Sequence, residues 1–246
     1  MSGYEASAHL YDLFDQKENV GFFSHYATPG EVVLDVGAGT GRIALFLAER
    51  DVRVVCVEPS PAMREQLRTK LAERPELNDK VHVVAQDAAS FDLNRTFPLA
   101  ILSGTYDHFL DRQERLASLR NIACHLQPAG ILVFDVFLGL MESSPLSRAG
   151  EIQRGNRTYR RFVGRQLLPG RNIEVKLVFE VYEGGELAEQ VEQRSVAAVT
   201  DRVQVHQVLA EAGFSVRREF SDYAFTPYRE GDELLIVEAV PSTQSK

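Results

Sequence analysis

The stretch VVLDVGAGTGR, residues 32–42, constrains the fold of this chain more than any other segment. It opens with apolar, β-branched residues, which favour a buried strand, and glycines follow at positions 37, 39 and 41. The next residues, IALFLAER, have the spacing of an amphipathic helix. A glycine-rich turn between a strand and a helix is typical of a loop that holds a nucleotide. We therefore expect an α/β fold with a nucleotide-type ligand at this loop.

The alternation of strands and helices continues along most of the chain. Apolar runs predict strands at 32–37, 53–58, 80–86, 99–104, 131–137, 215–222 and 232–240, and amphipathic runs predict helices at 41–50, 60–74, 112–126 and 201–214. Ser60 is the expected N-cap of the second of these helices, and Thr200 or Asp201 of the last. Nearly continuous apolar strands between helices indicate a parallel sheet that is covered on both faces.

Residues 141–200 have a different character, with no convincing helix. RTYRRFVGRQLL, NIEVKLVFEVYE and ELAEQVEQRSVAAV predict three antiparallel strands, and Gly184-Gly185 between the last two is a good hairpin signal. We therefore expect a ligand-binding core made of residues 1–140 and 201–246. Residues 141–200 are expected to form an antiparallel β insertion, which would act as a lid or substrate cap.

Composition and charge exclude several classes of protein. The formal net charge of −8 argues against a nucleic-acid partner. The two cysteines, Cys56 and Cys124, form no C-x-x-C pair and are expected to be buried, and the six histidines are scattered, so no metal site is expected. No apolar run reaches about 20 residues, and the first residues do not resemble a secretory signal. The expectation is a cytoplasmic enzyme, as monomer or homodimer, with no membrane partner.

The glycine spacing argues against a dinucleotide. A dinucleotide-binding loop has the pattern G-x-G-x-x-G, whereas here the spacing is G-x-G-x-G and Arg42 occupies the place of the third glycine. Asp35, two residues before the first glycine, would repel a pyrophosphate and would attract a cation or an amine. S-adenosylmethionine has a sulfonium, an α-amino group and no phosphate, so it fits this loop.

Two further strand ends offer ligands for the same molecule. Glu58 ends the second strand, where a carboxylate can accept hydrogen bonds from both ribose hydroxyls. Asp87 follows the third strand, where it can accept from an adenine amino group, and the backbone amide of Ala88 can donate to the neighbouring ring nitrogen. Because ligands of open α/β folds bind at the carboxyl edge of the sheet, these groups are expected to lie along one site.

This pattern resembles the class I S-adenosylmethionine-dependent methyltransferases. The resemblance rests on LDVGAGTGR (34–42), VEPSPAM (57–63), QDA (86–88) and LQPAGILVFD (126–135), and FPLAILSG departs from it by lacking the usual acidic residue. It implies a Rossmann-like seven-stranded sheet with an antiparallel last strand, helices on both faces and a small antiparallel β lid. The cofactor-binding residues that it implies are Tyr11, Asp35, Gly37, Ala38, Gly39, Gly41, Glu58, Pro59, Met63, Asp87, Ala88 and Ser103.

In this family the loop after the fourth strand lies beside the transferred methyl group. Here the loop is SGTYDHFLD, and His108 has the ordinary pKa of a base that works near neutrality. Tyr106 is the second catalytic candidate, as a contact for the methyl acceptor, and Asp107 is expected either to take part in the chemistry or to cap a helix. In related enzymes an N-terminal helix covers the cofactor, and Tyr11, in YEASAHLYDLFDQ, resembles the tyrosine that contacts it.

The insertion carries a concentration of positive charge. Seven arginines and one acid, Glu151, lie between residues 148 and 171, a local charge of +6. One interpretation is a solvated face with charged edge strands. The other is a lid that binds an anionic acceptor through Arg157, Arg160 and Arg161, because arginine offers a bidentate fork to phosphate and carboxylate. A strand-built insertion at this place resembles the methyltransferases that N-methylate nucleotide-linked amino sugars.

The sequence thus predicts a transferase that moves a methyl group to nitrogen or oxygen of a small molecule, with an anionic or nucleotide-linked acceptor as one candidate. One alternative is an RNA or protein methyltransferase, which the arginine cluster favours and the net charge opposes. Another is a protein that binds S-adenosylmethionine without catalysis, since the glycine loop, Glu58 and Asp87 would serve that role equally well.

Overall fold

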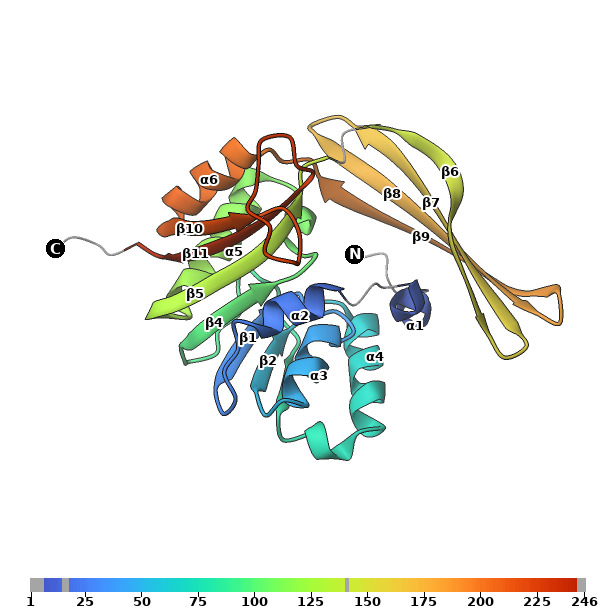
Figure 1. Cartoon of the computed structure of the whole chain (residues 1–246), viewed down its shortest axis with the longest axis horizontal. Coiled ribbons are helices and arrows are strands. Elements are labelled where there is room, and N and C mark those ends of the chain that lie inside the picture. The colour runs from blue at the N-terminus through green and yellow to red at the C-terminus, as the bar shows by residue number, and fades with distance from the viewer. Residues whose placement is uncertain (1–6, 15–17, 140–141, 243–246) are drawn as a thin grey trace.

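The computed structural model describes residues 7–14, 18–139 and 142–242, and its centre is a seven-stranded sheet (Figure 1). The strands lie in the order β10-β11-β5-β4-β1-β2-β3. Their bounds are β1 (Val32–Val36), β2 (Arg53–Val57), β3 (Val81–Val84), β4 (Phe97–Leu102), β5 (Leu126–Phe137), β10 (Phe214–Phe220) and β11 (Leu234–Pro241). β1 to β5 pair in parallel, whereas β11 runs antiparallel to both of its neighbours. The predicted fold class, including the antiparallel last strand, is confirmed.

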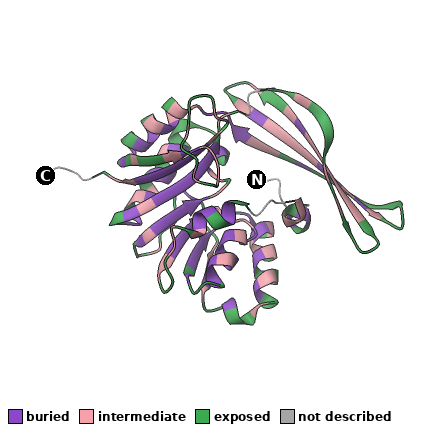
Figure 2. Cartoon of the chain, in the orientation of Figure 1, coloured by how far each residue is buried: buried purple, intermediate pink, exposed green. Residues whose placement is uncertain are grey.

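Helices cover both faces of this sheet because its central strands are apolar on both sides. The longer helices are α2 (Glu18–Ser24), α3 (Arg42–Ala48), α4 (Pro61–Ala72), α5 (Arg112–Cys124) and α6 (Arg202–Glu211). α5 and α6 pack on one face, and α2, α3 and α4 pack on the other. Figure 2 shows the central strands as the buried interior of this three-layer core. The sequence did not predict α2, which has only seven residues.

Side-chain caps fix where three of these helices begin. Ser60 caps α4 and Asp201, not Thr200, caps α6 in a capping box. Asp111 caps α5, so Asp107 has no capping role there. α5 ends at Cys124, which is exposed, so the prediction that both cysteines are buried is wrong for this one. The helix turns its apolar face toward the sheet, and Cys124 lies on the opposite side.

The insertion forms a second sheet, here called sheet B, of four antiparallel strands. They are β6 (Ser144–Arg154), β7 (Arg157–Leu168), β8 (Asn172–Glu183) and β9 (Glu186–Ala198). The sequence predicted three of them and missed β6, an edge strand of which most residues are exposed. Sheet B extends from the core as a long twisted arm, and β9 returns from its tip to the core (Figure 1).

The N-terminal strap, defined here as residues 7–14, connects the two sheets. It contains α1 (Ala8–Tyr11) and the single-turn helix η1 (Asp12–Phe14). Leu10 and Phe14 pack on one face of sheet B against Phe179 and Val191. On its other side the strap reaches the glycine-rich loop of the core, through Asp12. The predicted helix was longer at both ends, and its residues before 7 and after 14 lie outside the described range.

Candidate functional site

A pocket of about 1170 Å³ lies at the carboxyl edge of the central sheet. The loops that follow β1, β2, β4 and β5 form its floor, as expected for a ligand site in an open α/β sheet. Tyr11 of the strap and the β9 residues Arg194, Ser195 and Val196 form part of its wall. Sheet B therefore borders the pocket.

The glycine loop, residues 37–41, requires glycine at two positions, because a side chain there would collide with a neighbouring residue. Gly37 has a φ of 73°, and a Cβ there would lie 2.2 Å from Oγ1 of Thr105. Gly41 has a φ of 79°, and a Cβ there would lie 2.1 Å from Cδ1 of Leu67. Gly37 lines the pocket, whereas Gly41 lies behind it and allows α3 to pack on α4. Gly41 therefore has a packing role, and its contact with a cofactor stays a prediction.

Asp35 supplies a buried carboxylate at the end of β1. Its side chain is 2% exposed, and Oδ2 has no hydrogen-bond partner among the described residues. Burial, and then the nearby charge of Glu58, raise the pKa of Asp35 to about 7, against the lowering effect of Arg42. A buried acceptor atom that faces a pocket without a partner fits a bound ammonium group, which would restore the missing hydrogen bond.

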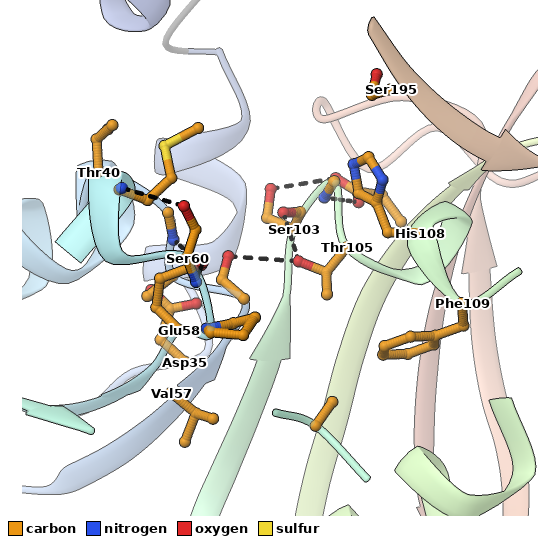
Figure 3. Close-up of a pocket in the computed structure, with 18 of the residues that line it drawn as sticks. Asp35, Thr40, Val57, Glu58, Ser60, Ser103, Thr105, His108, Phe109 and Ser195 are labelled. Atoms are coloured by element: carbon orange, nitrogen blue, oxygen red, sulfur yellow. Dashed lines mark hydrogen bonds between the residues drawn. The ribbon is translucent and has the colours of Figure 1, made fainter. Parts of the chain in front are cut away.

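Glu58 lies next to Asp35 at the end of β2 (Figure 3). One carboxylate oxygen accepts a hydrogen bond from the backbone amide of Gly39 at 2.8 Å, and the other accepts from the amide of Ser60 at 2.8 Å. Burial raises the pKa of Glu58, and these two hydrogen bonds oppose the rise. Glu58 thereby ties the glycine loop to the start of α4 and also lines the pocket, where a carboxylate fits a ribose diol.

Most of the cofactor-binding residues predicted from the sequence lie at the pocket. Those that line it are Tyr11, Asp35, Gly37, Ala38, Gly39, Glu58, Pro59, Met63, Asp87, Ala88 and Ser103. Asp87 also accepts hydrogen bonds from the amide of Ala89 and the hydroxyl of Ser90, so it shapes its own loop. Their contacts with a cofactor stay predictions.

The two catalytic candidates are separated by the turn of η3 (Tyr106–His108). His108 lines the pocket and is hydrogen-bonded to the backbone of Val196 in β9. Burial lowers the pKa of His108, which keeps its imidazole neutral at neutral pH. Tyr106 instead points into the core, where it is 0% exposed and stacks on Phe134 at 4.9 Å. Tyr106 does not line the pocket, so we withdraw it as a contact for the acceptor.

The predicted substrate arginines also lie away from the pocket. Arg157 pairs with Glu183 at 3.2 Å near the tip of sheet B, and Arg160 pairs with Glu151 at 2.7 Å. Arg161 lies over the ring of Phe14, with its guanidinium carbon 5.2 Å from the ring centroid. None of the three lines the pocket. The register of sheet B places Glu183 opposite Arg157 and Glu151 opposite Arg160, and Phe14 of the strap lies against Arg161. They therefore give no support to an anionic acceptor.

A polar cluster that the sequence had not indicated lies where β4 and β5 end. Asp135, in β5, accepts hydrogen bonds from the amide of Gly104 at 2.6 Å, the phenol of Tyr223 at 2.8 Å and the hydroxyl of Ser103 at 3.3 Å. Asn19, in α2, donates to the same Ser103 hydroxyl at 2.9 Å. The rule that found Asp35 and Glu58, an acid at the carboxyl end of a buried strand, would also have found Asp135.

The comparisons with known proteins agree with this geometry. Residues 33–130 match the methyltransferase domain family. The chain is 34% identical over 128 residues to a cypemycin N-terminal methyltransferase from a Streptomyces species, a match that covers 52% of this chain and 49% of the relative. It spans about half the length of the curated relatives that it matches.

Solved structures extend the likeness to almost the whole chain. The CcbJ methyltransferase from Streptomyces caelestis aligns with a TM-score of 0.80 at 19% identity, covering 98% of this chain and 99% of that one. CalS10, an amino pentose methyltransferase from Micromonospora echinaspora, aligns with a TM-score of 0.72 at 22% identity, covering 96% of both chains.

Residues 33–130 thus match a methyltransferase domain, and the chain as a whole has the Rossmann-like fold of class I S-adenosylmethionine-dependent methyltransferases. DesVI from Streptomyces venezuelae also aligns over nearly the whole chain, with a TM-score of 0.77 at 20% identity, covering 96% of this chain and 98% of that one. The resemblance predicted from the sequence, with S-adenosylmethionine as the cofactor, is confirmed at this level. Among the described residues no helix is long and apolar enough to cross a membrane.

Proposed function

We propose that this chain methylates an amine of a small molecule, with S-adenosylmethionine as the methyl donor. The observation that carries the proposal is a pocket of about 1170 Å³ that the core, the strap and sheet B enclose together. Pockets for one small ligand measure roughly 300–1,000 Å³, so this pocket has room for a cofactor and an acceptor side by side. The bound cofactor supplies an electrophilic methyl group, and the chain's task is to align the acceptor with it and exclude water.

The strand order suggests which side of the pocket holds the cofactor and which side holds the acceptor. Glu58 ends β2, Asp35 lies at the end of β1, Ser103 follows β4, and Asp135 lies near the end of β5. Neighbouring strands lie about 4.8 Å apart, so these side chains mark successive positions along one edge. We assign the β2, β1 and β4 ends to the cofactor. The acceptor then lies toward β5, on the side of the pocket that His108, Phe109 and Ser195 form (Figure 3).

The charges around the pocket favour a cationic acceptor over an anionic one. Its charged lining residues are Glu18, Asp35, Glu58, Asp87, Glu114, Asp135, Arg42 and Arg194. Arg194 is itself paired with Glu174 at 2.7 Å and with Glu192 at 2.9 Å. Six acids against two arginines give a negative field, which concentrates cations such as a protonated amine near the site.

His108 suits the removal of a proton from such an amine. An ammonium ion has no lone pair, so it must lose a proton before it can attack a methyl group. Because burial lowers the pKa of His108, its ring arrives neutral and able to accept that proton. The hydrogen bond to the backbone of Val196 commits one ring nitrogen and orients the other.

The test is a set of acceptors that share one carbon skeleton and carry an amine, a hydroxyl or a carboxylate. Each is incubated with methyl-labelled S-adenosylmethionine, and products are identified by mass. We expect transfer to the amine, with lower kcat/KM for the hydroxyl and none for the carboxylate. Transfer to RNA or protein but to no member of the set would contradict a small-molecule acceptor. Cofactor binding without any transfer would favour the non-catalytic alternative.

We also propose that the chain works in the cytoplasm as a monomer or a homodimer. The exposed thiol of Cys124 persists best in a reducing compartment. Light scattering after size-exclusion chromatography tests the oligomeric state, and a mass above that of a dimer would contradict it. Cell fractionation tests the location.

A further inference from the structure

We propose that Tyr223, oriented by Asp135, recognises an N–H group of the acceptor amine and thereby limits the reaction to primary and secondary amines. The inference rests on the proposed function. It concerns a residue that the sequence did not indicate, in the loop between β10 and β11. Tyr223 and Asp135 both line the pocket on its β5 side.

The hydrogen bonds at Asp135 fix the direction in which the phenol donates. Gly104 contributes an amide and has no other donor, so it donates to Oδ1. The phenol of Tyr223 and the hydroxyl of Ser103 both donate to Oδ2. Asp135 is 2% exposed, and burial raises its pKa, which the hydrogen bonds from Gly104, Tyr223 and Ser103 oppose. All three partners stand as donors to its two oxygens, which is the arrangement expected of a buried carboxylate.

A phenol whose single proton is donated to a carboxylate can only accept from any further partner. Toward the pocket, Tyr223 is therefore a hydrogen-bond acceptor, made more negative by the charge of Asp135 behind it. The matching group on a ligand is a donor. An amine fulfils this requirement because it can attack through its lone pair and donate an N–H to Tyr223 at the same time.

The ring of Tyr223 is held in place independently of its hydroxyl. It packs against Phe22, with the ring centroids 5.9 Å apart, and against Phe23 at 6.3 Å. Both phenylalanines belong to α2 and are buried in the core. Because the ring has these contacts, removal of the hydroxyl leaves the packing in place, and the effect of the hydroxyl on recognition can be measured by itself.

The hydrogen bond also fits the charge that develops during transfer. The lone pair of the acceptor nitrogen forms the new N–C bond, while the S–C bond breaks and its electron pair stays on sulfur. The nitrogen becomes cationic, so its N–H donates more strongly to Tyr223 as the reaction proceeds. The product leaves as a protonated amine and loses its proton to water. Once the nitrogen has no N–H, as in a tertiary amine, this interaction cannot form and methylation stops.

The test compares the Tyr223→Phe variant with wild type on primary, secondary and tertiary amines of one skeleton. For wild type we expect methylation of the first two and none of the third. For Tyr223→Phe we expect kcat/KM for the primary amine to fall at least tenfold, with an unchanged Kd for S-adenosylmethionine. Tyr26→Phe is the matched control, because Tyr26 also donates to a buried carboxylate, Glu238, at 3.1 Å, but outside the pocket. It should leave kcat/KM unchanged.

A double-variant cycle tests whether the two residues act as a unit. Asp135→Asn should lower kcat/KM as well, and adding Tyr223→Phe to it should cause little further loss. If wild type methylates tertiary amines as well as secondary ones, or if Tyr223→Phe has the activity of wild type on primary amines, the inference is wrong and the proposed function stands. If wild type methylates no amine at all, both fail.

Discussion

Thr40, in the glycine loop, donates a 2.6 Å hydrogen bond from its hydroxyl to Asp12, in the N-terminal strap. Lys70, in α4, pairs with the same carboxylate and also donates to the backbone oxygen of Thr40 at 2.9 Å. The strap is thereby fastened to the loop that is expected to hold the cofactor. On its other side, Ser7 donates to Gln193 in β9, so one short segment holds sheet B to the core.

The first prediction follows from this attachment. Asp12→Ala removes the hydrogen bond to Thr40 and the ion pair with Lys70, so the strap should move away from the glycine loop more often. A hydrogen bond to a charged group contributes ~1.5–3 kcal/mol. We expect S-adenosylmethionine to dissociate roughly ten times faster, measured by stopped-flow displacement. His9→Ala, in the same strap but paired with the exposed Glu189, is the control. Equal dissociation rates in Asp12→Ala and His9→Ala would contradict the role of Asp12 in holding the strap on the glycine loop.

The second prediction concerns Glu58. Glu58→Ala removes the expected acceptor for the ribose hydroxyls and the two hydrogen bonds to Gly39 and Ser60. We expect the Kd for S-adenosylmethionine to rise at least tenfold by calorimetry, since hydrogen bonds to a charged acceptor are worth ~1.5–3 kcal/mol each. Glu65→Ala, on the exposed side of α4, should have no effect. Unchanged affinity in Glu58→Ala would rule out the assigned position of the ribose.

The third prediction concerns His108 as the base. His108→Ala should lower kcat by ~10²-fold or more and leave the Kd for the cofactor nearly unchanged. Because the pKa of His108 is lowered, its neutral form persists below the ordinary value of about 6.5. The kcat of wild type should therefore rise with pH and reach its plateau at a pH below about 6.5. His82→Ala, on the exposed part of β3, is the control. A variant with full turnover would reduce His108 to a structural residue.

The fourth prediction concerns stability and pH. Burial raises the pKa of Asp107 to about 7, and its Oδ1 has no hydrogen-bond partner among the described residues. Because the pKa of Asp107 is higher in the folded state than in the unfolded state, the protonated carboxyl stabilises the fold fully below about pH 4. This contribution to the free energy of unfolding is lost as the pH rises through about 7. Asp107→Asn resembles the protonated form, so it should match wild type only below about pH 4, for example near pH 3.5. Near pH 8 it should be more stable, by roughly 1–3 kcal/mol.

Urea unfolding at the two pH values measures this difference. Methyl transfer by the same variant shows whether Asp107 also takes part in the chemistry, as the sequence left open. Equal stability of variant and wild type at pH 8 would mean that Asp107 carries no such cost.

The sequence by itself determined the core fold and the half of the pocket that we assign to the cofactor. The period of apolar residues identifies buried strands, and the carboxyl ends of parallel strands meet at one edge, so the order of residues alone places Asp35 and Glu58 together. These are local signals, because each residue is located by the strand that directly precedes it.

Tertiary structure decided the half of the pocket that we assign to the acceptor. Tyr223 and Asp135 are 88 residues apart and meet only because β11 inserts between β5 and β10. In the sequence, Arg157 and Arg160 belong to a cluster of positive charge with one acid. Strand pairing within sheet B places Glu183 against Arg157 and Glu151 against Arg160. Tyr106 and His108 are two residues apart, and the turn of η3 sends one into the core and the other to the pocket. Contacts between distant segments depend on strand order and register, which no local pattern of residues encodes.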